Sequence, residues 1–181
     1  MLPAHEIPYL AGVGGVAQAQ HHRVATEEML IRLVGVGNEF RADDGLGICV
    51  ARELKRRGLP GIDVREHSGE AAGLVELLRG TSAAILIDAI SSGKPPGTIH
   101  RIDAARGRIS PALFRFSTHG YGIAEGIETA RLLGCLPQMT ILLGIEGESF
   151  TQSVGLSDAV VKNVPTLLYL IDSEIEQLRA S

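Results

Sequence analysis

The chain has 181 residues, of which 45% are hydrophobic, so one domain with a substantial core is expected. Its formal net charge of −4 and its pI near 5.9 argue against a nucleic-acid-binding protein, which would carry a basic face. The two cysteines, Cys49 and Cys135, form no C-x-x-C pair and are too few for a disulfide scaffold, which favours a reducing cytoplasm.

Residues 1–28 differ from the rest of the chain, because they are rich in Pro and Gly and have no sustained apolar period. Ala17-Gln18-Ala19 has the form of a signal-peptide cleavage site, but Glu6, and no Lys or Arg, precedes the apolar part. No later segment reaches the roughly 18 apolar residues that a membrane span needs. We therefore expect residues 1–28 to be a disordered extension, followed by a single cytoplasmic domain over residues 29–181.

An apolar run from Leu30 to Val36 opens this domain and predicts a buried strand. It ends at Gly35 and Gly37, where the backbone needs a positive φ or has a close neighbour. The turn leads into a predicted helix over residues 44–57.

Asp43 and Asp44 stand at the entrance of this helix and exclude a phosphate-binding turn. The third glycine of a G-x-G-x-x-G dinucleotide fingerprint would fall at Phe40, and two carboxylates would repel a pyrophosphate. No Gly-Lys-Ser/Thr follows, which excludes a P-loop. Aspartate is also a common helix cap, and Asp43 is the candidate for that role, which leaves Asp44 for another.

Strands and helices alternate along the rest of the chain. The pattern predicts an α/β fold, a three-layer sandwich in which helices cover both faces of a largely parallel, twisted sheet. Pro165 should kink or split the last helix. We expect strands over residues 62–66, 83–89, 98–102 (an edge strand) and 139–145, and helices over residues 71–78 and 120–133 and from residue 157.

In such a sheet the C-terminal ends of the parallel strands share one edge, where ligands bind. Asp44 follows the first strand, Asp88 closes a central strand, and His119 precedes a helix, so we expect all three at that edge. Each has a structural explanation alone: a helix cap, a strand end bonded to its own loop, a satisfied loop histidine. Together they make a three-ligand set for a borderline divalent ion, with open coordination positions.

The other histidines lack this context. They lie in the extension (His5, His21 and His22) or in or beside strands (His67 and His100).

The common protease motifs are missing from the sequence, which contains neither a G-x-S-x-G nucleophile elbow nor an H-E-x-x-H zinc helix.

The pattern Gly-x-Gly-Asn-x-x-x-x-Asp-Asp-Gly-x-Gly over residues 35–47 resembles the start of the hydrogenase maturation endopeptidases. This family trims the C-terminus of the large subunit of nickel-iron hydrogenases. The resemblance extends to the C-terminus through five further motifs, in chain order: Ser68-Gly69-Glu70, Ile87-Asp88-Ala89, Pro96-Gly97-Thr98, Ser117-Thr118-His119-Gly120 and Gly144-Ile145-Glu146.

The resemblance implies an endopeptidase, grouped with the aspartic type, that removes a C-terminal peptide from the nickel-loaded precursor of a large subunit. It implies that Asp44, Asp88 and His119 are the catalytic residues and the ligands of the nickel in that precursor, with no resident cofactor. Asp44 stands where many relatives carry Glu, and its arm is shorter by one C–C bond. We expect a monomer whose partner is the precursor, without nucleic-acid or membrane contacts.

Several alternatives stay open at this point. The attacking water could be activated by Asp44, by Asp88 or by the metal. The same three residues would also serve a non-catalytic nickel-centre assembly chaperone. A small-molecule enzyme on a doubly wound sheet would instead need a phosphate-friendly helix N-terminus, which this chain lacks.

Overall fold

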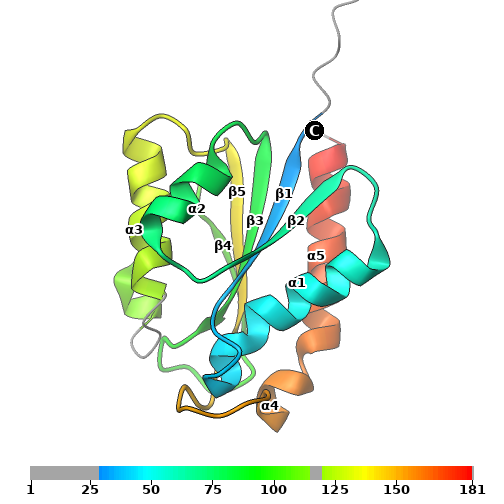
Figure 1. The fold of residues 1–181 in the computed structure, drawn as a ribbon, viewed down its shortest axis with the longest axis vertical. Helices are drawn as coiled ribbons and strands as arrows, with labels where there is room; N and C mark the ends of the chain where they lie inside the picture. Colours follow the sequence, from blue (N-terminus) through cyan, green and yellow to red (C-terminus); the bar gives the residue numbers. More distant parts are fainter. Residues whose placement is uncertain (1–28, 115–119, 181) are drawn as a thin grey trace, which may run out of the picture.

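A twisted sheet is the middle layer of the computed structural model, which describes residues 29–114 and 120–180 (Figure 1). Among these residues, five strands pair in the order β2-β1-β3-β5-β4. The strands are β1 (Ile31–Val36), β2 (Ile62–His67), β3 (Ala83–Ile90), β4 (Ile99–Asp103) and β5 (Met139–Glu146). The helices are α1 (Leu46–Arg57), α2 (Ala71–Leu78), α3 (Gly120–Leu132), α4 (Asp158–Val161) and α5 (Val164–Arg179), with 3-10 turns η1 (Ala42–Gly45) and η2 (Pro111–Leu113).

The predicted architecture is confirmed. Strands β2, β1, β3 and β5 are parallel, and β4 pairs antiparallel with β5 at the edge of the sheet. Helices α1 and α5 cover one face, and α2 and α3 cover the other (Figure 1). None of the helices in the described part of the chain is long and apolar enough to cross a membrane. The expected extension, residues 1–28, lies outside the described residues.

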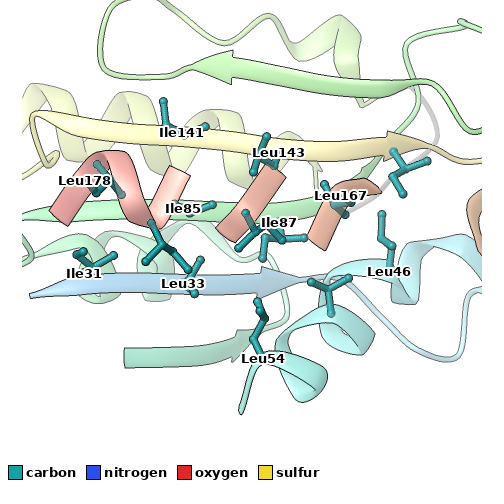
Figure 2. Packing of buried hydrophobic residues seen from close by; sticks show 14 of the residues in the cluster. Ile31, Leu33, Leu46, Leu54, Ile85, Ile87, Ile141, Leu143, Leu167 and Leu178 are labelled. Atoms are coloured by element: carbon teal, nitrogen blue, oxygen red, sulfur yellow. The ribbon is translucent and has the colours of Figure 1, made fainter. Parts of the chain in front are cut away.

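Two apolar cores, one on each face of the sheet, bury β3 completely. In Figure 2, side chains of β1, β3 and β5 pack against Leu167 and Leu178 of α5, with Leu54 of α1 beside them. All eight residues of β3 are buried, as expected for a continuous apolar strand between two layers of helices. Ala84 and Leu86 belong to the core under α2 and α3, so the alternation of the strand places Asp88 on that same face.

The start of α1 differs by two residues from the prediction, whereas the other predicted boundaries lie within one residue of those observed. Helix α1 begins at Leu46 rather than Asp44, because the chain first turns through η1, which it enters at Ala42 with a φ of 48°. The last helix is divided into α4 and α5, as anticipated for Pro165. Pro165 lies in the first turn of α5, where a backbone N–H has no intrahelical partner and its loss costs little.

Helix α1 packs directly on the backbone of the sheet through two glycines. A Cβ atom on Gly47 would lie 2.1 Å from the carbonyl oxygen of Val36 and 2.3 Å from that of Ile87. A Cβ atom on Gly35 would lie 2.0 Å from the carbonyl oxygen of Gly47. This close approach holds the start of α1, and with it η1, against the ends of β1 and β3.

We expect Gly47→Ala to lower the free energy of unfolding by about 3 kcal/mol, because neither backbone oxygen can move aside without disturbing the sheet. Gly107→Ala is the matched control, since a Cβ atom there meets no atom within 4 Å. Denaturant unfolding of both variants measures the difference. Equal stability of the two variants would contradict the role given to this contact.

Candidate active site

The C-terminal ends of β1 and β3 form the switch point of the sheet. From β1 the chain passes through α1 to β2 on one side, and then crosses through α2 to β3 on the other side. Ligands bind at such points in doubly wound sheets, because the connections leave in opposite directions and open a crevice. Asp44 lies in η1 directly after β1, and Asp88 is the sixth residue of β3.

The loop after β1 brings Asp44 next to Asp88. Gly37 has a φ of 142°, and a Cβ atom on it would lie 1.8 Å from the backbone oxygen of Asp44 and 3.8 Å from Oδ1 of Asp88. The amide of Asn38 donates a hydrogen bond of 3.1 Å to the same backbone oxygen of Asp44. Only glycine combines this φ with so little space, which explains the second glycine of the motif.

Asp44 and Asp88 are both fully buried, and the environment of Asp88 disfavours its charged form. Burial raises the pKa of Asp88 well above its usual value, and the negative charge of Asp44 raises it further, with a small opposing effect from the backbone amide of Ala89. Among the described residues, no side chain donates a hydrogen bond to either carboxylate oxygen of Asp88. Such a group is stabilised by a proton or by a cation.

Asp43 is not the helix cap that the sequence suggested, since neither η1 nor α1 has a side-chain cap hydrogen bond. Its buried carboxylate instead accepts hydrogen bonds from three backbone amides of the loop after β5. Oδ2 accepts from Glu148 (2.8 Å) and Ser149 (3.0 Å), and Oδ1 accepts from Ser157 (2.6 Å). Asp43 is therefore structural, and Asp44 remains the candidate for chemistry.

His119 lies outside the described residues, so its position relative to Asp44 and Asp88 stays a prediction. Its described neighbours lie near this edge. Phe114 forms a β-bridge with Ser91, directly after β3, and α3 begins at Gly120 on the face that Asp88 shares (Figure 1). Within residues 29–114 and 120–180, no group of three His, Cys, Asp or Glu side chains could hold a metal ion.

Sequence reasoning missed that His67 lies at the same edge. His67 is the last residue of β2 and is opposite Val36 in the parallel register with β1. Its Nδ1 accepts a hydrogen bond of 2.9 Å from the amide of Gly69, and its Nε2 lies 3.4 Å from Oε1 of Glu70. The sequence could have indicated this position, because ligands bind at the C-terminal ends of parallel strands and His67 directly follows the predicted strand over residues 62–66.

His100 and Glu146 form a buried structural pair at the edge strand. Nε2 of His100 lies 2.9 Å from Oε2 of Glu146, and because a carboxylate only accepts, the imidazole donates. Burial lowers the pKa of His100, and the hydrogen bond to Glu146 partly opposes this effect. Glu146 also accepts hydrogen bonds from Ser92 Oγ (2.8 Å) and the amide of Gly93 (2.7 Å), which fixes the loop after β3.

Several known proteins that this chain resembles take part in hydrogenase maturation or formation, according to their names. A family model described as hydrogenase maturation protease (HycI) matches residues 48–174. The hydrogenase 2 maturation protease of Escherichia coli (strain K12) is 30% identical over 158 residues, which cover 84% of this chain and 90% of that protein. The hydrogenase expression/formation protein HupD of Rhodobacter capsulatus is 32% identical, over 83% of this chain and 71% of that protein. The match to HupD of Thiocapsa roseopersicina, at 29% identity, covers 64% of this chain and only 53% of that protein.

Solved structures share the fold. The hydrogenase maturating endopeptidase HybD from E. coli superimposes with a TM-score of 0.70 at 24% identity, over 82% of this chain and 93% of that chain. A solution structure of an endopeptidase from Escherichia coli gives the same TM-score at 25% identity, over 79% of this chain and 90% of that chain.

We expect Asp88→Asn to stabilise the metal-free protein at neutral pH by at least about 1 kcal/mol, because the amide needs neither a proton nor a cation. The unfolded carboxyl titrates near 3.8, whereas the folded one titrates higher. At a pH between the unfolded and the folded pKa of Asp88, the folded wild type holds the proton and the unfolded wild type does not. The free energy of unfolding of the wild type therefore falls as the pH rises through that window. The advantage of the variant should therefore shrink as the pH falls towards 3.8.

Denaturant unfolding at several pH values measures this advantage. Asp172→Asn, at a side chain that is 46% exposed, is the control, with an expected change within about 0.5 kcal/mol. A loss of stability in Asp88→Asn that is independent of pH would contradict the expectation.

We expect Asp43→Ala to lower the free energy of unfolding by about 3 kcal/mol, because it leaves three buried amides without their charged acceptor. Asp43→Asn keeps one acceptor oxygen and should lose less. Amide hydrogen exchange reports the cause directly, since the amides of Glu148, Ser149 and Ser157 should lose protection in the Ala variant. Unchanged protection there would show that the loop is held by other contacts.

Proposed function

The chain belongs to the hydrogenase maturation protease family, and from this premise we propose that it removes a C-terminal peptide from the nickel-loaded precursor of a nickel-iron hydrogenase large subunit. As a member of that family it is a peptidase, and thus a hydrolase. We further propose that it works in the cytoplasm as a monomer and belongs with the aspartic-type enzymes. Its net negative charge supports a protein rather than a nucleic-acid partner.

The observation that carries the proposal is the fully buried pair of carboxylates at the switch point. Asp44 and Asp88 repel each other, and burial raises the pKa of Asp88. A divalent cation that reaches them offsets both penalties at once. The pair is therefore suited to a cation that comes and goes with the substrate, and we propose that this cation is the nickel held by the precursor.

Carboxylate oxygens and an imidazole nitrogen are suitable partners for a borderline ion such as nickel. In this proposal Asp44 and Asp88 contact the metal together with His119. The precursor supplies the remaining ligands, so the metal is part of the substrate and the enzyme needs no resident ion. A precursor without nickel offers these residues no cation to bind, and it is rejected.

Hydrolysis requires a group that takes a proton from the attacking water and returns one to the leaving amine. Asp88 is the candidate for this task, because it is a carboxylate at the edge of the sheet where the scissile bond would lie. A carboxylate has two oxygens, so Asp88 can contact the metal through one and the water through the other. Asp44 then acts as a charge that tunes Asp88 and as a metal contact.

The test combines two precursors with two enzyme treatments. We expect the enzyme to cleave nickel-loaded precursor and to leave nickel-free precursor uncut, as followed by the mass of the large subunit. Enzyme treated with a chelator, and then freed of it, should cleave loaded precursor at the normal rate. Recovery of activity only after metal is returned to the enzyme would overturn the proposal in favour of a resident catalytic ion.

Variants separate the protease from the chaperone hypothesis. Asp88→Asn and His119→Ala should each abolish processing without lowering the melting temperature, while Asp172→Asn should process normally. Wild-type enzyme that binds loaded precursor but never cleaves it would instead support a non-catalytic assembly chaperone. Unfolding of the Asp88 or His119 variant would assign that residue a structural role.

A further inference from the structure

An apolar cavity of about 440 Å³ lies between η1, the turn that carries Asp44, and the loop that leads into α4. One wall comes from η1 and the first two turns of α1, and the other from the loop after β5 and from α4. The apolar part of the lining consists of Ala42, Gly45, Ile48, Val154, Leu156 and Val161. This cavity is called the η1–α4 pocket below.

The rim of the pocket exposes large apolar side chains. Val154 is 77% exposed and Val161 is 51% exposed, although both are aliphatic and stand beside a recess. Phe40, which is 66% exposed, lines the neighbouring cavity that shares Glu39, Ile48 and Arg52 with this one. A single exposed apolar residue is ordinary, but a group of them around a recess indicates a binding surface.

The two walls are held together before any ligand arrives. Asp43 in η1 binds three amides of the opposite loop, and the amide of Ala42 donates a 2.7 Å hydrogen bond to the carbonyl of Ser153. The amide of Ser153 in turn donates a 3.2 Å hydrogen bond to the carbonyl of Phe40. A preformed pocket costs little ordering entropy on binding, so an apolar group that enters it gains most of its transfer free energy.

The pocket borders the turn that carries Asp44. Asp44 lies between Ala42 and Gly45 in the same four-residue turn, and these two residues line the pocket. An extended peptide advances about 3.4 Å per residue, so a chain whose scissile bond is at Asp44 brings a neighbouring residue to the pocket. The nearest charges are already paired, since Arg52 contacts Glu39 at 2.7 Å and Glu66 at 3.1 Å.

Resting on the proposed function, we propose that the η1–α4 pocket is a specificity subsite that receives an apolar side chain of the precursor tail, close to the bond that is cut. The carboxylate pair then recognises the metal of the precursor, and the pocket recognises the sequence of its tail. The partner is thus a polypeptide with an apolar residue within a few positions of the scissile bond.

Steady-state processing of nickel-loaded precursor by the full chain tests the subsite. Val154→Asp and Val161→Asp place a charge at the rim of the pocket and should raise KM by about 10-fold or more, with little change in kcat, since an apolar contact of this kind is worth about 10- to 200-fold. Leu132→Asp is the control, because Leu132 is 83% exposed at the far end of α3, away from this edge (Figure 1). Both rim positions are exposed, so the melting temperature should not change.

Cys49 provides an independent probe, because it lines the pocket and is exposed, whereas Cys135 lies elsewhere and is partly buried. Saturating nickel-loaded precursor should slow the alkylation of Cys49 by N-ethylmaleimide and leave the rate at Cys135 unchanged. Analytical ultracentrifugation of the free enzyme tests a competing occupant. A wild-type dimer that Val161→Asp converts to a monomer would assign the pocket to a second copy of the chain and overturn the proposal.

Failure of the subsite and failure of the proposed function are distinguishable. If the wild type cleaves loaded precursor while both rim variants keep its KM and Cys49 stays reactive, the subsite is wrong and the protease function stands. If the wild type does not cleave at all, the proposed function fails, and protection of Cys49 alone would then show that the precursor still binds here.

Discussion

The mutual repulsion of two buried carboxylates, Asp44 and Asp88, is the constraint around which this structure is organised. Burial raises the pKa of Asp88, and the nearby negative charge of Asp44 raises it further. The fold enforces the arrangement through backbone contacts that leave no room to relax: Gly47 presses α1 onto the sheet, and Gly37 turns the chain onto Asp88. In the proposed function, a cation brought by the substrate offsets the cost of burying this pair.

The acidic residues at this edge of the sheet differ in how many hydrogen bonds their carboxylates accept. Asp43 accepts three backbone hydrogen bonds and acts as a structural anchor. Glu146, at the end of β5, is likewise satisfied by Ser92, Gly93 and His100. Asp88 lies on the neighbouring strand and receives no hydrogen bond from a described side chain. Carboxylates with several hydrogen bonds, such as Asp43 and Glu146, hold the loops of this edge in place, whereas the buried Asp88 has a raised pKa, as is common for groups at functional sites.

Two neighbouring recognition elements would limit the proposed cleavage to one bond of the substrate. In the proposed scheme the carboxylate pair responds to the metal centre, and the η1–α4 pocket responds to the tail. Neither contact alone places a peptide bond at Asp88, so a substrate must satisfy both. Hydrogen bonds between η1 and the loop after β5 hold the turn that carries Asp44 against the opposite wall of the pocket.

Local periodicity and turn chemistry were enough to predict the alternating α/β order, most element boundaries to within one or two residues, and the division of the last helix at Pro165. The strand-end rule also placed Asp44 and Asp88 at one edge, because parallel strands carry their C-terminal ends to the same side. Tertiary structure alone decided the role of Asp43, whose partner Ser157 is 114 residues away, and the position of His67 at the working edge. The η1–α4 pocket also became visible only in the tertiary structure, because its two walls come from segments that are far apart in the sequence. Periodicity records which face of an element is buried, whereas hydrogen bonds and recesses between loops depend on how distant segments meet, and no local pattern carries that information.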